Sequence, residues 1–319
     1  MGYVAEAEDP SIALETRDLV IKVIDNTGLL AAPADPAARS LTELLTPLTH
    51  YLGYHGIRTL YRKDEKRNLV APYCSWLNLQ TATLEGIAPD PVDERAFAGM
   101  ARGWPMQMER KQRGVVLRLH PLPSMRVCYS LELQPAEPDG LDFRICFEFG
   151  RRPEHGPAHF RATWPCYING YDDVRLSYPK ALPRTAPGVS NPLGWDWVSL
   201  GEPPDLVLGE TVGYRHVQEV FYAEGSALPL AYGRIGDHVL ILAFSDPRVR
   251  LFVVNAGGHL AFSPVQNPAW DFEWAIEDYP LNEPVGFSGR LIYTCFENTE
   301  QVLDRYRQWA GASGSLGAL

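Results

Sequence analysis

The sequence is poor in cysteine, and its cysteines lie far apart. Five cysteines occur in 319 residues, and no two of them form a C-x-x-C pair. A disulfide framework needs paired cysteines and a zinc site needs clustered ones, so neither is expected. The sequence therefore predicts free, buried thiols in a reducing compartment and no bound metal.

Long hydrophobic runs and a signal peptide are also missing. No segment has the length of a membrane span, and the first residues, MGYVAEAEDP, lack a basic region followed by an apolar run. We therefore expect a soluble, cytoplasmic protein with no membrane partner, although removal of a signal peptide would leave secretion open.

Basic clusters are absent as well. The formal net charge is −10, and acidic residues interrupt every group of lysines and arginines. A nucleic-acid partner is not expected, because binding of phosphates needs a basic face. The sequence carries no signal for an oligomeric state.

Several catalytic signatures do not occur. The sequence contains neither G-x-x-x-x-G-K-[ST] nor a strand-linked G-x-G-x-x-G, which removes the usual phosphate-binding loops. H-E-x-x-H and G-x-S-x-G are also missing, so zinc-protease and α/β-hydrolase chemistry lose their motifs. No cofactor is demanded by the sequence.

Helical periodicity is scarce and is clearest near the C-terminus. In NTEQVLDRYRQWAG, residues 298–311, Asn298 can cap a helix and Gln301 lies at the capping-box offset. An apolar stripe follows, so we expect a helix that packs on a sheet. Short helices are also predicted within 38–52 and 94–103.

Strand patterns dominate what remains. The clearest is LDFRICFEF, residues 141–149, in which apolar and polar side chains alternate. Proline, glycine and aspartate separate many such runs at short intervals, as in antiparallel sandwiches. The sequence predicts a mostly β fold: one large antiparallel β-sandwich, or supersandwich, with few short helices and a C-terminal helix. It spans 1–311 as a single domain, followed by a flexible tail, 312–319.

The aromatic and polar content suits a sugar ligand. Eight tryptophans and fifteen tyrosines exceed what a core needs, and sugar rings stack on such side chains. Trp195 and Trp197 end a proline-rich segment, 177–197, that we expect to form a long loop. These mixtures favour a saccharide over a hydrophobic ligand.

The order of elements resembles a known superfamily. An early strand enters the turn DNTG (25–28), many antiparallel strands follow, and AWDFEW (269–274) precedes a closing strand and helix. This order is similar to that of the galactose mutarotase-like β-supersandwich proteins, which include aldose 1-epimerases and the sandwich domains of many glycoside hydrolases and polysaccharide lyases. The resemblance implies a ligand on the concave face of one sheet, with a histidine acid and a glutamate base.

The epimerases' histidine segments have no residue-by-residue match here. Epimerase, lyase and hydrolase activity therefore stay open, each by general acid/base chemistry. The alternatives are a non-catalytic carbohydrate-binding module and a sandwich used for protein interaction. The candidate catalytic residues are His216, Glu219, Asp271 and Glu273. The candidate substrate-binding residues are His55, Trp195, Trp197, Tyr222, Arg234 and Arg290.

The stretch NPAWDFEWAIEDYP, residues 267–280, concentrates rings and acids. As a strand it would place Trp270, Phe272 and Trp274 on one face and Asp271 and Glu273 on the other. We expect a hairpin with the strand at 287–296. The three rings would then lie inside the sandwich, and the two acids would face outward near Arg290 across the ladder.

Overall fold

The structure is a computed structural model with three antiparallel sheets. It describes residues 11–25, 55–65, 67–71, 74–84, 106–119, 126–152, 158–169, 176–181, 195–200, 220–222, 226–254 and 269–312. The smallest sheet has the order β1 (Ile12–Glu15), β2 (Leu19–Ile24) and β3 (Gly56–Arg62).

The largest sheet has nine strands, each antiparallel to its neighbours. Its order is β11 (Trp195–Leu200), β10 (Leu176–Ala181), β13 (Leu230–Ile235), β14 (His238–Phe244), β17 (Pro284–Cys295), β8 (Gly140–Phe149), β7 (Val127–Ala136), β6 (Gly114–Leu119) and β5 (Met106–Lys111). The five-stranded sheet has the order β12 (Val220–Tyr222), β15 (Val249–Val254), β16 (Ala269–Glu277), β9 (His159–Trp164) and β4 (Thr81–Leu84).

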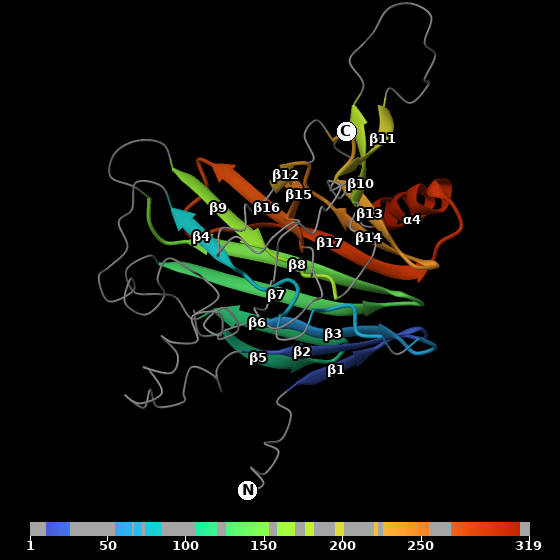
Figure 1. Ribbon diagram of the computed structural model, residues 1–319. Helices are drawn as coiled ribbons and strands as arrows, with labels where there is room; N and C mark the ends of the chain where they lie inside the picture. The colour runs from blue at the N-terminus through green and yellow to red at the C-terminus, as the bar shows by residue number, and fades with distance from the viewer. Residues whose placement is uncertain are drawn as a thin grey trace, which may run out of the picture.

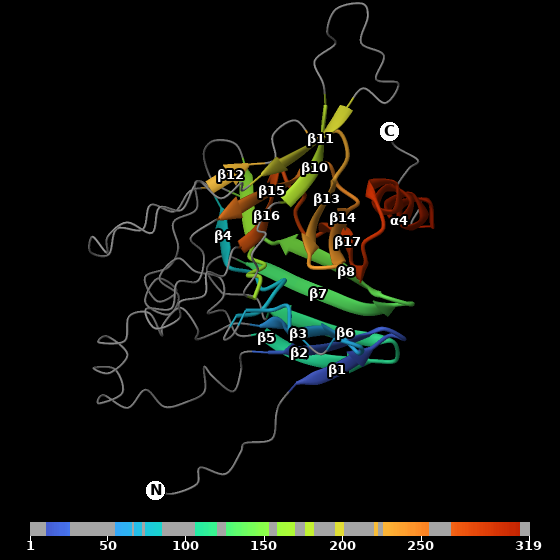
Figure 2. The same cartoon turned by 45° about the vertical axis from the view of Figure 1, so that its right-hand side comes forward.

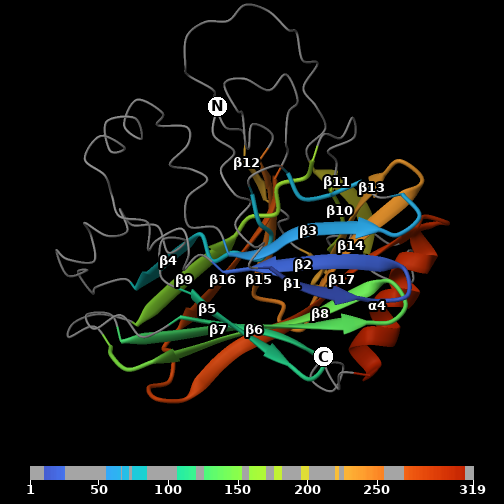
Figure 3. The ribbon, with the colours of Figure 1, turned by 90° about the horizontal axis from the view of Figure 1, so that it is seen from below.

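The three sheets share a hydrophobic core. Figures 1 to 3 show the three-stranded sheet beside β5, β6 and β7, and the five-stranded sheet beside the other end of the nine-stranded sheet. A single cluster of buried side chains includes residues from all three sheets. The alternating residues of β8 supply part of it, since Leu141, Phe143, Ile145, Phe147 and Phe149 are all buried. The predicted mostly β, antiparallel sandwich is confirmed.

The predicted C-terminal helix is α4 (Thr299–Ala312). Asn298 caps the helix, because its Oδ1 accepts a hydrogen bond from Gln301 N at 3.0 Å. Gln301 Oε1 reaches back to Glu297 N at 3.0 Å, one residue before the cap, so the second bond of a capping box is displaced by one residue. The apolar stripe of α4 packs on side chains of β13, β14 and β17, on the outer face of the nine-stranded sheet. Of the helices in the described residues, none is long and apolar enough to cross a membrane.

Some sequence predictions fall on other parts of the chain. The short helices within 38–52 and 94–103 and the tail beyond Ala312 lie outside the described residues, and the single-domain boundary at 311 stays a prediction. The long loop expected at 177–197 is wrong at both ends, because β10 and β11 pair with each other there. The five cysteines are free thiols, but only Cys74 and Cys166 are buried, and Cys295 is exposed.

The predicted hairpin between the stretch 267–280 and the strand at 287–296 is also wrong. β16 pairs with β15 and β9, whereas β17 pairs with β14 and β8 in the other large sheet. Between the two strands the chain crosses the core, where the buried Tyr279 ring packs on Phe149 with 4.1 Å between ring centroids. The Arg152 guanidinium holds this crossing by donating to the carbonyl oxygens of Asp278 and Tyr279.

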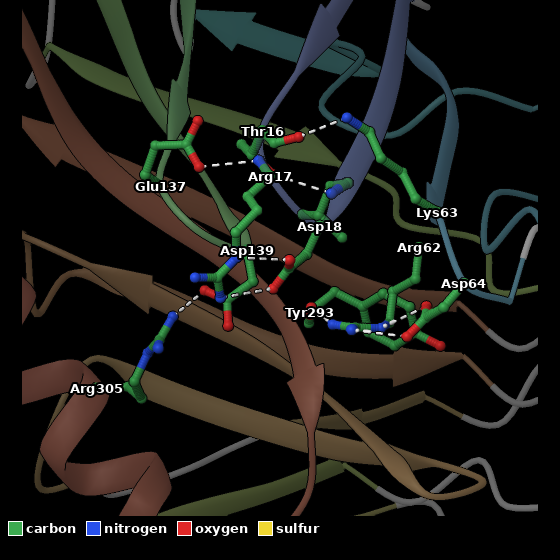
Figure 4. A network of polar contacts seen from close by, with 11 residues as sticks. Thr16, Arg17, Asp18, Arg62, Lys63, Asp64, Glu137, Asp139, Tyr293 and Arg305 are labelled. Carbon is green, nitrogen blue, oxygen red and sulfur yellow. Dashed lines mark hydrogen bonds and ion pairs between the residues drawn. The ribbon is translucent and has the colours of Figure 1, made fainter.

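A polar clamp ties the three-stranded sheet to β17 (Figure 4). The nearly buried Arg62, at the end of β3, donates to the carbonyl oxygen of Tyr293 at 3.3 Å. Its other nitrogens donate to the carboxylate of Asp64 at 3.1 and 3.0 Å. Nearby, Asp139 in the β7–β8 turn forms an ion pair with Arg305 of α4. These contacts join elements that are far apart in the sequence.

Replacement of Arg62 by methionine is expected to lower the free energy of unfolding by about 1–3 kcal/mol, because the Tyr293 carbonyl loses a charged donor in a buried place. Asp64→Asn should cost less than about 1 kcal/mol, since the Asp64 side chain is 64% exposed and its ion pair is screened. Urea unfolding of both variants measures the difference. Equal losses would contradict the assignment of the clamp to the Arg62–Tyr293 contact.

Candidate functional site

The two faces of β16 carry different chemistry, as its alternation predicts. Trp270, Phe272 and Trp274 are buried in the core between the large sheets, which confirms the expected interior position of the rings. Asp271 and Glu273 share the opposite face of the strand. They are not exposed acids, however: 8% of Asp271 and 5% of Glu273 is accessible. The expectation that they face solvent is therefore wrong.

Glu273 lies in a polar row that runs across the five-stranded sheet. Register pairs it with Arg250 on β15 and with Thr163 on β9, and Thr163 is paired with Thr81 on β4. Directly paired residues point to the same side of a sheet. Arg250 Nη1 contacts Glu273 Oε1 at 3.2 Å, and the Thr81 and Thr163 hydroxyls are 2.6 Å apart. We call this row together with Asp271 the polar face.

Asp271 has the most perturbed acidity on the polar face. Burial disfavours its charged form and raises the pKa of Asp271 to about 7, although a hydrogen bond from Cys166 N to Oδ1, at 3.1 Å, opposes the shift. Both protonation states are then populated near neutral pH. A carboxyl group with this property can accept and donate a proton during a reaction.

A short segment, residues 74–80, borders the polar face, and we call it the polar segment. Gln80 N donates to Thr163 O at 2.9 Å, and the Trp76 indole donates to Tyr167 O at 2.7 Å. A backbone hydrogen bond from Leu77 reaches the thiol of Cys166, and burial raises the pKa of this thiol. The polar segment is thereby linked to Asp271 through Cys166.

Three oxygen atoms of the polar segment are buried without a hydrogen-bond partner among the residues that the structure describes: Ser75 Oγ, Asn78 Oδ1 and Gln80 Oε1. An unsatisfied buried acceptor costs about 1–3 kcal/mol, and native structures keep few of them. Leu77, between them, has φ of 56°, which is uncommon for a branched side chain. Unsatisfied groups and backbone strain concentrate at functional sites.

Five of the predicted residues lie on edge strands or outside the described residues. His216 and Glu219 are outside the described residues. Trp195 and Trp197 belong to β11, at the edge of the nine-stranded sheet. Tyr222 belongs to β12, where register places it opposite Phe252, which is itself opposite Asp271. The backbone of Tyr222 therefore lies in the same row of the sheet as Asp271.

The two predicted arginines lie on the other large sheet. Arg290 of β17 binds the Asp142 carboxylate of β8 with two contacts, at 2.6 and 2.7 Å. Its expected position beside Asp271 and Glu273 is wrong, because β16 and β17 are not neighbours. Arg234 of β13 lies over the Phe296 ring, with 4.8 Å from Cζ to the centroid. Neither arginine is on the polar face.

His55 is fully buried at the start of β3, where its Nε2 accepts a hydrogen bond from Leu79 N at 3.0 Å. It holds the polar segment rather than lining an exposed rim.

Sequence reasoning missed Arg250, Thr163 and the three oxygen atoms of the polar segment. The only signal was indirect: Cys166 lies in WPCYINGYDD, one of the mixed polar and aromatic stretches. In the described part of the chain, no three His, Cys, Asp or Glu side chains are grouped to hold a metal ion.

These sheets, their shared core and the closing helix define the class: the chain has a galactose mutarotase-like β-supersandwich fold, as its sequence resemblance implies. No protein-family model and no curated protein sequence matches it. Among solved structures, a "putative aldose 1-epimerase" from Escherichia coli K12 is similar, with a TM-score of 0.53 and 11% identity over 90% of this chain and 99% of that one. At this identity the likeness shows the fold alone.

Two larger enzymes are similar at lower scores. A 4-alpha-glucanotransferase from Thermococcus litoralis has a TM-score of 0.45 and 10% identity, over 88% of this chain and 37% of its own. The heparan sulfate lyase HepC from Pedobacter heparinus has a TM-score of 0.34 and 9% identity, over 88% of this chain and 30% of its own.

Proposed function

We propose that the protein binds a saccharide on the polar face and acts on it by general acid/base chemistry. The observation that carries this proposal is Asp271, a buried carboxyl whose pKa is raised to about 7 by loss of solvation. A carboxylic acid tuned to neutral pH is suited to moving a proton to or from a sugar hydroxyl. The fold adds support, because the similar structure from Escherichia coli is named for an aldose 1-epimerase.

Each residue of the polar face has a role in this proposal. Asp271 exchanges the proton. Glu273 and Arg250, already paired at 3.2 Å, accept from and donate to adjacent hydroxyls, as charged groups do in sugar sites. Thr163 supplies a further hydroxyl. Asp271 and Glu273 are two residues apart on one strand, so they point to the same side of the sheet and their Cα atoms are about 7 Å apart.

The other sequence candidates complete the proposal. His216 and Glu219, outside the described residues, are candidates for the second acid/base group, and Trp195, Trp197 and Tyr222, on the edge strands β11 and β12, are candidates for stacking on the ring. Interconversion of anomers is the reaction to test first, given the name of the similar structure. Lyase and hydrolase chemistry need the same two kinds of group, so product analysis distinguishes the three.

A non-catalytic saccharide-binding role is the second candidate. The row from Arg250 to Thr81 favours it, since these groups form hydrogen bonds with hydroxyls and need not change their protonation. Under this alternative, the protein binds a sugar without converting it. Preventing the ionisation of Asp271 then has no turnover to change. A protein-interaction sandwich would bind no saccharide.

Two arginine variants test the location of the site. Arg250→Met on the polar face is expected to abolish the increase in melting temperature caused by a saccharide, whereas Arg290→Met on the other sheet should preserve it. Both arginines pair with a carboxylate, at 3.2 and 2.6 Å, so the variants are matched in chemistry. Thermal unfolding with mono- and oligosaccharides, uronates included, is the measurement.

The opposite pattern, with Arg290→Met losing the saccharide effect, would move the site to the nine-stranded sheet. If no saccharide shifts the melting temperature of the unmodified protein, both the catalytic and the binding proposals fail. Polarimetry or NMR exchange between anomers then separates catalysis from binding for any sugar that does bind.

A further inference from the structure

The imidazole of His55 acts as a hydrogen-bond acceptor in a buried place. Leu79 N donates to His55 Nε2 at 3.0 Å, and the histidine has no accessible surface. A ring nitrogen that accepts a hydrogen bond carries no proton. The ring is therefore neutral, with its proton on Nδ1, and the structure fixes this tautomer through a backbone amide of the polar segment.

The backbone around His55 keeps the polar segment close to β3. Ile57 and Trp76 exchange two backbone hydrogen bonds, each of 2.8 Å. Gly56, between His55 and Ile57, has φ of 101°, and a Cβ at this position would lie 2.4 Å from the carbonyl oxygen of Trp76. A side chain would not fit there. The glycine therefore allows the backbone next to His55 to lie close to the polar segment, which contains Leu79.

Hydrogen bonds connect the polar segment to the polar face. Directly after Leu79, Gln80 N donates to Thr163 O at 2.9 Å. Before it, the backbone of Leu77 contacts the Cys166 thiol, and Cys166 N donates to the Asp271 carboxyl at 3.1 Å. A displacement of Leu79 would therefore move groups beside both acids of the polar face, Thr163 next to Glu273 and Cys166 next to Asp271.

We propose that His55 is a positioning residue whose unprotonated Nε2 holds the polar segment against the polar face, and whose protonation releases the Leu79 amide and loosens the site. An imidazolium would direct an N–H at another N–H, which replaces an attraction by a repulsion. The effect on ligand affinity rests on the proposed saccharide site. The effect on the Leu79 amide does not.

Among the described residues, the ionisable groups on the elements linked to His55 include Cys74 in the polar segment, Cys166 after β9, and Asp271 and Glu273 on β16. Burial raises the pKa of Cys166 above its ordinary value and that of Asp271 to about 7. Both groups are then mainly neutral under mildly acidic conditions. They add little charge that would favour an imidazolium, and both the complete burial of the ring and its hydrogen bond from Leu79 N oppose protonation.

Two substitutions of His55 separate positioning from simple packing. In His55→Gln, the amide oxygen occupies about the place of Nε2 and accepts from Leu79, but it cannot take up a proton. His55→Leu fills similar space and accepts nothing. Amide hydrogen exchange of Leu79, followed by NMR between about pH 5 and 8, reports the hydrogen bond directly and needs no saccharide.

In the unmodified protein, protection of the Leu79 amide is expected to fall at least tenfold on acidification, corrected for intrinsic exchange. The Gln variant should keep its protection across this range and retain saccharide affinity at the acidic end. The Leu variant should lose both at every pH. Constant Leu79 protection in the unmodified protein, or identical behaviour of the Gln and Leu variants, would overturn the proposal.

The unmodified protein and the Gln variant suffice if the Leu variant does not fold. A protein that binds no saccharide overturns the proposed function, and Leu79 exchange alone then decides the role of His55.

Discussion

Replacement of Asp271 by asparagine is expected to stabilise the protein above neutral pH and to reduce conversion of its saccharide by at least about 100-fold. The two effects have one origin. A buried carboxyl that must lose its proton costs free energy, and the same tuned proton is what the proposed chemistry uses. Asparagine has nearly the same shape, and its oxygen can still accept the hydrogen bond from Cys166 N.

The pH dependence of the stabilisation follows from the raised pKa. Folding raises the pKa of Asp271 from 3.8 to about 7, so between these values the folded protein holds a proton that the unfolded chain releases. Stability conferred by this proton is full below pH 4 and is lost as the pH rises to 7. The loss reaches at most about 4 kcal/mol, at 1.36 kcal/mol for each unit of pKa.

Asp271→Asn does not lose stability in this way as the pH rises, because asparagine does not ionise. Its own amide nitrogen needs an acceptor, which costs about 1 kcal/mol where none is provided. We therefore expect Asp271→Asn to equal or fall slightly below the unmodified protein at pH 4 and to exceed it by about 2–3 kcal/mol at pH 8. Urea unfolding at the two pH values measures this crossover.

Asp142→Asn is the matched control, because Asp142 is a half-exposed aspartate on the other large sheet, paired with Arg290. It should give no stabilisation at pH 8 and no loss of saccharide conversion. A stability difference for Asp271→Asn that does not change with pH would show that the Asp271 carboxyl is not the buried acid described above. Full activity of the variant would remove Asp271 from the proposed mechanism.

Gly233→Ala is expected to be strongly destabilising. Gly233 lies on β13 of the nine-stranded sheet, and a Cβ there would lie 1.9 Å from an atom of the Trp270 ring on β16. Trp270 is buried, and its ring is rigid, so one of the two sheets must shift. Overpacking of this kind costs about 1–3 kcal/mol and more where nothing can move. We expect a loss of about 3 kcal/mol.

A second substitution tests whether the Trp270 ring is the cause. Trp270→Leu alone should cost about 2–4 kcal/mol through lost packing. In the double variant, the smaller leucine leaves room for the added methyl group. The double variant should therefore lose clearly less than the sum of the two single losses, with a coupling of about 1–2 kcal/mol.

Urea unfolding of the four proteins completes this double-mutant cycle. Gly236→Ala, in the turn between β13 and β14, is the control substitution. A Cβ at Gly236 meets nothing within 4 Å, although its φ of 60° makes alanine mildly strained, so this variant should show no coupling to Trp270→Leu. Strict additivity of Gly233→Ala and Trp270→Leu would mean that the glycine is required for another reason.

Local patterns in the sequence predict the elements better than their partners. The alternation in β8 and β16 correctly separates core rings from polar side chains, because a strand turns successive side chains to opposite faces. The caps of α4 are equally local. The choice of neighbour is not local: nothing within 267–296 indicates that the chain crosses the core between β16 and β17 instead of forming a hairpin.

The candidate site depends even more on distant contacts. Asp271 and Glu273 could be identified as two acids on one face, but their burial depends on what covers that face. Arg250 and Thr163 come next to Glu273 only through register with β15 and β9. His55 looked like a ligand-binding residue between two glycines, and its actual contact, with Leu79, requires the fold of the polar segment.

The contact between Arg62 and Tyr293 has a consequence for folding during synthesis. Arg62 ends the first sheet, yet the carbonyl that it binds belongs to Tyr293, 231 residues later in the chain. During synthesis the first three strands emerge long before the strand that secures them. Until β17 has been synthesised, part of the apolar inner face of these strands is uncovered. The nascent chain therefore exposes apolar surface to which chaperones can bind.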